Sequence, residues 1–173
     1  MKKLELITKA NGNMPRTDEE KKQMITQAAE YYGQFLEALG FDWKADPHSD
    51  RTPHRVAKAW VNDLIAGSIN PAPEVTAFPN DEGYTGLICQ TRIPVMSMCA
   101  HHNLTFSGVA HVHELCVGNR GVAVVVESQH NCVKCRGIKQ DSVMKTSQMS
   151  GYFWTNEIGT RQEFFQLIDQ SRT

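Results

Sequence analysis

The stretch that decides the fold covers residues 87–112 and reads LICQTRIPVMSMCAHHNLTFSGVAHV. Two runs within it, Leu87 to Val95 and Leu104 to Val112, have the length and the β-branched or alternating composition of strands. Between them lies the run Met98-Cys99-Ala100-His101-His102, on a short connection. We therefore expect two consecutive strands, with one thiol and two imidazoles at their junction.

Two helices are predicted before these strands. Thr17 and Glu20 have the spacing of a capping box, and apolar residues then recur at steps of three and four until Gly40. Thr52 as the N-cap, with Pro53 at the first helical position, predicts a second helix that Gly67 ends. Each helix therefore has one face to bury.

The second half of the chain continues with strands. They are expected at Val122 to Glu127 and, more weakly, around Val143 to Met149. A second capping box, Thr160 with Glu163, predicts a final helix. The residues Gln129-His130-Asn131-Cys132 close the Val122 strand and bring another thiol and imidazole to a strand end.

Composition excludes several classes of function. The 173 residues include 18 basic and 19 acidic ones, so the strong positive field that binds duplex nucleic acid or an anionic membrane is missing. No apolar run reaches the roughly 18 to 20 residues of a membrane span, and the first residues do not resemble a signal peptide. We expect a soluble, cytoplasmic protein, whose five cysteines serve as metal ligands or small core residues rather than disulfides.

The clustered thiols and imidazoles predict a zinc site. Zinc favours these ligands, and a catalytic site keeps three protein ligands with the fourth position open to water. Cys99, His102 and Cys132 supply that set. His101 and His130 flank the three ligands, and imidazole is well suited to moving protons near neutral pH. The residues alone therefore favour zinc-dependent hydrolysis.

Two other interpretations of this region stay open. Cys132 and Cys135 form a Cys-x-x-Cys pattern, which fits a structural zinc site whose other ligands are Cys99 and His102. It also fits a redox pair. In a third interpretation, Cys132 is a ligand and Cys135 is a packed small residue. The redox pair ranks last, because the residues after Cys135 do not predict a helix start. A basic cluster, Lys134, Arg136 and Lys139, suits the oxygens of a phosphate chain but is also typical of a solvated surface.

Three separated motifs resemble the GTP cyclohydrolase I family. They are Thr52-Pro-His-Arg-Val-Ala-Lys58, Cys99-Ala-His-His102 and His130-Asn-Cys-Val-Lys-Cys-Arg-Gly-Ile138. The resemblance extends from about residue 17 to Asp169. It implies an α+β T-fold (tunnelling fold) with an antiparallel sheet, paired helices and an N-terminal helical extension. We accordingly expect an N-terminal arm and helix at residues 1–50 and a T-fold catalytic domain at residues 51–173.

The resemblance also implies an activity. Enzymes of this family add water at C8 of GTP, release formate and form 7,8-dihydroneopterin triphosphate, for tetrahydrofolate, pterin or deazaguanine synthesis. The family's zinc ligands correspond to Cys99, His102 and Cys132, and its catalytic histidines to His101 and His130.

The family's other contacts and its assembly give further expectations. Arg136 matches an arginine that contacts the triphosphate, Lys134 lies beside it, and Arg55 is expected to serve a neighbouring subunit's site. The implied assembly is a homodecamer of two pentamers with sites at subunit interfaces, and pairing strands between subunits also removes exposed sheet edges.

The chain departs from the family pattern at three places. Ala100 stands where a glutamate is usual, and Cys135 where alanine is common. After Val112 the family continues through a long segment with two helices, whereas only His113 to Arg120 precede the next strand here. In the family, that segment carries serine, lysine and arginine contacts to the triphosphate and the Gln-Glu pair that recognises guanine.

Two explanations of the short segment compete. Either the protein is naturally shortened, or the sequence omits a segment, with His113 to Cys116 ending the second missing helix. We favour omission, because removing the helices that cover one face of the sheet exposes apolar surface to water. The alternative function is a T-fold homologue that binds a pterin or deazapurine with altered or lost activity. Retention of the zinc ligands and both histidines argues against that alternative.

Overall fold

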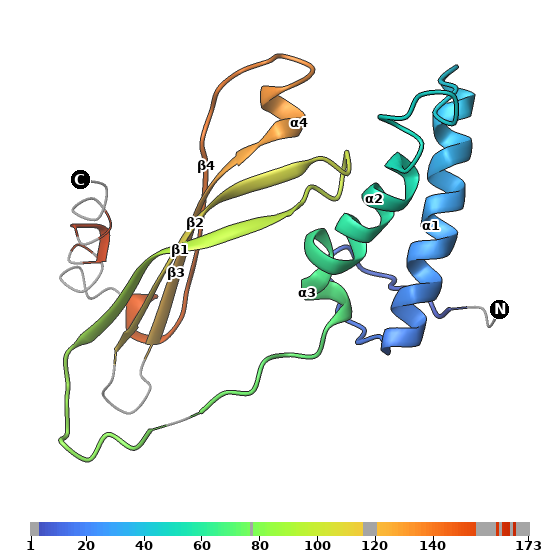
Figure 1. The fold of residues 1–173 in the computed structure, drawn as a ribbon. Helices are drawn as coiled ribbons and strands as arrows, with labels where there is room; N and C mark the ends of the chain where they lie inside the picture. The colour runs from blue at the N-terminus through green and yellow to red at the C-terminus, as the bar shows by residue number, and fades with distance from the viewer. Residues whose placement is uncertain are drawn as a thin grey trace. The chain divides into compact units, whose positions relative to one another are not determined.

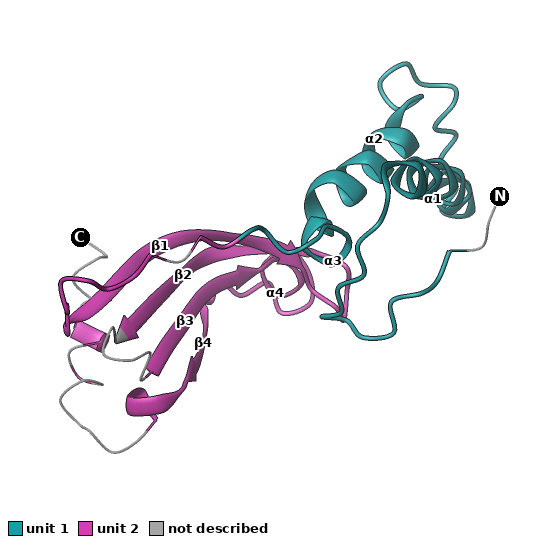
Figure 2. Cartoon of the chain, turned by 90° about the horizontal axis from the view of Figure 1, so that it is seen from below, with its two compact units in different colours: residues 1–74 teal, residues 75–173 magenta. Residues whose placement is uncertain are grey.

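The structure is a computed structural model that describes residues 4–76, 78–115, 121–154, 162, 164–166 and 168. The chain forms two compact units, Met1–Glu74 and Val75–Thr173 (Figure 2). The first unit is helical and the second is built on a sheet (Figure 1). The predicted division at residues 50 and 51 falls inside the first unit, between its two main helices. A catalytic domain at residues 51–173 stays a prediction.

Helix α1, Asp18–Ala38, begins and ends at the residues that its sequence signals indicate. The Thr17 hydroxyl accepts a hydrogen bond from the Glu20 N–H at 3.2 Å, and the Glu20 carboxylate accepts one from the Thr17 N–H at 2.9 Å. This reciprocal pairing confirms the predicted capping box. Gly40 has φ of 87° just beyond the C-cap, a left-handed conformation that glycine adopts without steric cost.

The second helix differs from its prediction at both ends. Helix α2 spans Thr52–Ala59, its N-cap is Arg51, and Thr52 already lies inside the helix. A π-helical turn, Trp60–Leu64, and a short helix α3, Ala66–Ile69, follow it. Gly67 therefore lies within α3, and the prediction that it ends the helical segment was wrong.

Distant residues explain why α3 continues past Gly67. The Asn13 side-chain amide donates to the carbonyl oxygens of Gly67 and Asn70, at 2.7 and 2.9 Å. The Met14 N–H donates to the Ser68 carbonyl at 2.8 Å. These donors satisfy carbonyl groups that a helix end otherwise leaves to water. The residues around position 13 are thus fixed against the end of α3.

The second unit contains one antiparallel sheet in the order β1-β2-β3-β4. Its strands are β1 at Leu87–Met98, β2 at Thr105–Leu115, β3 at Gly121–His130 and β4 at Met144–Met149. All four predicted strands are confirmed, and the α+β class with them. A short helix α4, Asn131–Lys134, follows β3, and a 3-10 turn, Gly151–Phe153, follows β4. No helix among the described residues is both long and apolar enough to cross a membrane.

The core of the second unit lies on one face of the sheet. Ala123, Val125 and Met149 from the strands pack with Phe153, Phe164 and Ile168 from the C-terminal part of the chain. Residues 162, 164–166 and 168 are helical, in agreement with a final helix. Thr160 and Glu163, its predicted capping box, lie outside the described residues.

The residues after Val112 correct the sequence interpretation of the short segment. His113 pairs with Ala123 and Leu115 with Gly121 across β2 and β3, so His113–Leu115 extend a strand and do not end a helix. His113 is completely buried, and its ring meets the Phe164 ring edge-on at 4.5 Å. Residues of the C-terminal part therefore cover this face of the sheet, which weakens the argument that the shortened chain leaves it to water.

Candidate metal centre

Two of the predicted zinc ligands, Cys99 and Cys132, lie where three strand ends meet. Cys99 directly follows β1, and Cys132 lies in the first turn of α4 directly after β3. The Cys99 N–H donates to the Leu104 carbonyl at 2.8 Å, and the Asn103 N–H donates to the Cys99 carbonyl at 2.8 Å, which closes a tight turn into β2. Because the strands are antiparallel, the end of β1, the start of β2 and the end of β3 lie at the same end of the sheet.

Two buried thiols form the centre of the site. Cys99 and Cys132 are only 7% and 9% exposed, and their sulfur atoms lie 3.7 Å apart. His130 Nδ1 lies 4.0 Å from the Cys132 sulfur, and His101 Nδ1 lies 4.0 Å from the Cys99 sulfur. One ligand atom each from Cys99, His130 and Cys132 lies within 4.8 Å of the other two. The site therefore offers two sulfur donors and one nitrogen donor at one point.

The environment ionises one thiol and keeps the other protonated. Hydrogen bonds from the His101 backbone and the His102 side chain lower the pKa of Cys99 to about 5. Burial, together with the neighbouring Cys99 sulfur, raises the pKa of Cys132. The Cys132 thiol donates to the Cys99 sulfur. The pair thus holds one thiolate at neutral pH, the form of cysteine that binds metals.

The spacing of the sulfur atoms fits a tetrahedral metal ion. Two thiolates bound to one zinc ion, each about 2.3 Å from it, lie about 3.8 Å apart at the tetrahedral angle. The 3.7 Å between the Cys99 and Cys132 sulfurs agrees with that value. A Cys-His-Cys group with this geometry can hold a metal ion, and it matches the donor types that zinc prefers.

The histidine that joins the two thiols in the three-donor group is not the one that the sequence predicted as a ligand. His102, expected to be the third ligand, hydrogen-bonds to Cys99 but is outside the three-donor group found among the described residues. His130, expected to be catalytic, belongs to that group. His101 and His102 are exposed, with ring centroids 6.3 Å apart. All three imidazoles therefore surround the thiol pair.

Cys135 has a partner other than the candidate metal site. Its thiol is exposed and donates to Asn131 Oδ1 at 3.6 Å. Within the described part of the chain, it is not a member of the donor group. The geometry thus gives no support to a four-ligand site that includes Cys135.

The residues predicted to bind phosphate are only partly free to do so. Lys134 Nζ lies 3.1 Å from a carboxylate oxygen of Asp141 and 3.3 Å from Gln129 Oε1, so its charge is partly neutralised. Arg136 is exposed one residue beyond Cys135. Arg55 belongs to the first unit, where it donates to the His48 carbonyl at 2.7 Å.

Sequence reasoning missed two contacts that hold the end of β3. The rings of Phe106 and His130 stack, with centroids 4.6 Å apart and planes 12° from parallel. Asn131 Nδ2 donates to Thr105 Oγ1 at 2.7 Å. The signal for the stack is the strand register, in which Phe106 is directly opposite His130. No spacing along the chain reveals that register.

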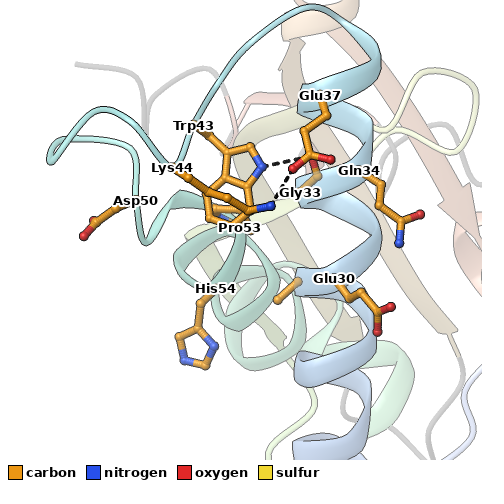
Figure 3. A pocket seen from close by; sticks show the side chains of 10 residues that line it. Glu30, Gly33, Gln34, Glu37, Trp43, Lys44, Asp50, Pro53 and His54 are labelled. Atoms are coloured by element: carbon orange, nitrogen blue, oxygen red, sulfur yellow. Dashed lines mark hydrogen bonds and ion pairs between the residues drawn. The ribbon is translucent and has the colours of Figure 1, made fainter.

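A separate hollow of about 490 Å³ lies in the helical unit (Figure 3). Lys44 extends along the Trp43 indole, 5.0 Å from the ring centroid, and its ammonium reaches the Glu37 carboxylate at 2.9 Å. Trp43 Nε1 also donates to the Gly33 carbonyl at 3.1 Å. These contacts fix the loop after α1 against the helix. None of the predicted site residues lines this hollow.

Comparisons with known proteins point to one family. The family model described as GTP cyclohydrolase I matches residues 28–119 and 113–169. The two matched segments overlap at residues 113–119, as expected when a chain skips part of the family pattern.

Named relatives are similar over most of the chain. It is 32% identical to GTP cyclohydrolase 1 of Porphyromonas gingivalis over 197 residues, covering 90% of this chain and all of that protein. It is 31% identical to GTP cyclohydrolase 1 of Bacteroides fragilis, covering 87% and 98%, and 31% identical to that of Teredinibacter turnerae, covering 82% and 97%. The first alignment is longer than this chain of 173 residues, so the relative contains residues that have no counterpart here. Because the family model matches most of this chain and these relatives are similar over most of it, the chain belongs to the GTP cyclohydrolase I family.

Proposed function

We propose that this chain catalyses the GTP cyclohydrolase I reaction. Water adds at C8 of GTP, the imidazole ring opens, formate leaves, and the remainder rearranges to 7,8-dihydroneopterin triphosphate. The observation that carries the proposal is the buried pair of Cys99 and Cys132, 3.7 Å apart and surrounded by three imidazoles, in a chain of this family. The curated relatives reported above all have the name of this enzyme.

Zinc is the proposed metal, with Cys99, His102 and Cys132 as its ligands. A bound zinc ion supplies a water molecule of lowered pKa, which is a nucleophile near neutral pH. The hydrogen bond between the His102 side chain and Cys99 supports this set. A second assignment replaces His102 with His130, because the His130 ligand atom lies within 4.8 Å of both sulfurs.

Proton transfer is assigned to His101 and His130. Both rings lie beside the thiol pair, with Nδ1 4.0 Å from a sulfur atom. The opposite ring nitrogen, Nε2, is then available to a substrate. Opening the purine imidazole ring requires protons to be taken from the attacking water and delivered to a ring nitrogen, which is general acid and base catalysis.

The triphosphate is proposed to contact Arg136 and Lys134, beside the α4 turn, with Arg55 contributing from a neighbouring subunit. Arg136 is exposed, and a guanidinium binds phosphate oxygens through two parallel hydrogen bonds. Lys134 exchanges its contact with Asp141 for a phosphate in this proposal. The T-fold homologue that binds a pterin or deazapurine without turnover gains no support from the relatives' names.

The active form is proposed to be a cytoplasmic homo-oligomer, a decamer of two pentamers. In the described sheet, β1 and β4 each have one unpaired edge, and such edges are commonly covered by another chain. Tyr31 and Phe35 of helix α1 and Leu39 at its C-cap form an exposed apolar stripe at steps of four residues. The free cysteines among the described residues agree with a reducing compartment.

Turnover of GTP by the zinc-loaded protein tests the function directly. Release of formate and the fluorescence of oxidised neopterin are expected for the native chain. Both signals and the bound zinc are expected to be lost in Cys132→Ala. Cys135→Ala is the matched control, because this thiol is exposed and three residues away, and it is expected to keep both. A native protein that binds zinc but releases no formate from GTP contradicts the proposal.

Metal content then separates the two ligand assignments. If His102 is the third ligand, His102→Ala loses zinc, whereas His130→Ala keeps zinc and loses turnover. The opposite pattern establishes His130 as the ligand. Metal content is measured by atomic absorption on protein dialysed against a weak chelator.

A further inference from the structure

We propose that Phe106 is a positioning residue, which holds the His130 imidazole in the orientation needed for proton transfer. The two residues are direct partners across β2 and β3. Their rings are nearly parallel, 12° apart, with centroids separated by 4.6 Å. The inference rests on the proposed role of His130 and adds a residue that acts through it.

The stack restricts the rotation of the histidine ring. Phe106 covers one face of the imidazole, so turning the His130 ring about its Cβ–Cγ bond breaks the ring contact. In the stacked orientation, Nδ1 lies 4.0 Å from the Cys132 sulfur. Nδ1 and Nε2 are on different edges of an imidazole. The stack therefore directs Nδ1 to the thiol pair and leaves Nε2 for the substrate.

A second contact fixes the adjacent backbone. Asn131 Nδ2 donates to Thr105 Oγ1 at 2.7 Å, so the residue after His130 is tied to the residue before Phe106. The ring stack and this hydrogen bond join the same two short segments, the start of β2 and the end of β3. With the backbone fixed on both sides, the orientation of the His130 ring depends mainly on the aromatic face opposite it.

Loss of the stack is expected to lower kcat more than it raises KM. An ångström of misplacement at a reacting group costs up to about a hundredfold in rate. A variant in which the His130 ring still adopts the correct orientation for part of the time loses less of its reaction rate. We expect kcat to fall about tenfold in Phe106→Leu, with KM within about twofold, because His130 acts in the chemical step.

The test combines kinetics with chemical modification of histidine in the zinc-loaded protein. Diethyl pyrocarbonate modifies accessible imidazole nitrogens, and peptide mass spectrometry gives the rate at each histidine. In Phe106→Leu and Phe106→Met, the rate at His130 is expected to rise severalfold and the rate at the exposed His48 to stay unchanged. Phe106→Tyr retains the ring and is expected to restore both kcat and the native rate at His130. Phe78→Leu is the matched control, because Phe78 is exposed and lies in the segment before β1.

Each result supports or overturns the assignment. An unchanged modification rate at His130 in Phe106→Leu and Phe106→Met overturns it, even if kcat falls. A Phe106→Tyr protein as impaired as Phe106→Leu also overturns it. Phe106→Met fills nearly the same volume without a ring and provides the comparison if Phe106→Leu does not fold. If the native protein does not turn over GTP, the proposed function fails, while the modification rates still decide whether Phe106 orients His130.

Discussion

The close approach of β2 to β3 at Gly108 makes a sharp prediction about stability. Gly108 is opposite Ser128 in the sheet. A Cβ atom at position 108 would lie 2.7 Å from Ser128 Cα and 2.8 Å from the Glu127 carbonyl carbon, and closer still to the Glu127 carbonyl oxygen. These are backbone atoms, which no change of rotamer can move away. Gly108→Ala therefore forces the two strands apart.

The size of the effect follows from this geometry. Reaching an ordinary contact of 3.4 Å from Ser128 Cα alone requires a shift of about 0.7 Å, and the nearer Glu127 carbonyl oxygen requires a larger one. Overpacking of a rigid interior costs 1 to 3 kcal/mol, and a purely backbone obstacle belongs at the upper end, so we expect a loss of about 3 kcal/mol. With an m-value near 2 kcal/mol/M, the urea midpoint falls by about 1.5 M.

Urea unfolding followed by far-UV circular dichroism measures this loss. Gly67→Ala is the matched control, because a Cβ at Gly67 meets nothing within 4 Å and the residue lies within helix α3. That change is expected to be neutral or to stabilise by up to about 1 kcal/mol. The zinc content of Gly108→Ala is also expected to fall, since Phe106 and His130 lie only two residues from the strained pair. An unchanged urea midpoint in Gly108→Ala refutes the reasoning.

Three further predictions concern titration and assembly. The pKa of Cys99 is lowered from 9.0 to about 5, so its ionisation stabilises the metal-free fold increasingly between pH 5 and pH 9. In the presence of a chelator, Cys99→Ser is expected to show a smaller rise in Tm over that range than the native protein. An equal rise in the two proteins contradicts this. Burial, aided by the nearby His111, lowers the pKa of His113 below 6.5. The urea midpoint of the native protein should therefore fall between pH 7.5 and pH 5.5, and the midpoint of His113→Leu should fall less. Equal falls in the two proteins exclude His113 as the cause. Phe35→Glu is expected to reduce the mass measured by light scattering and Lys22→Gln to leave it unchanged; a native mass for Phe35→Glu excludes the α1 stripe as an interface.

Local sequence signals predicted the helices and strands wherever the partners are close in the chain. The capping box of Thr17 and Glu20 is satisfied by residues three positions apart, and it is present as predicted. The prediction that Gly67 ends the second helix was wrong, because the group that satisfies the Gly67 carbonyl is the Asn13 side chain, 54 residues away. The same limitation applies to His113, whose place in a strand depends on its pairing with Ala123.

The candidate metal site shows the same division. The sequence by itself determined the donors, since thiols and imidazoles clustered at strand ends indicate zinc whatever their exact arrangement. Only the tertiary structure decided that the Cys99 and Cys132 sulfurs, 33 residues apart in the chain, lie 3.7 Å from each other. It also brought the His130 donor atom to that pair and placed Phe106 across its ring. The physical reason is the register of antiparallel strands, which is set by pairing between distant segments and is not encoded in any short run of residues.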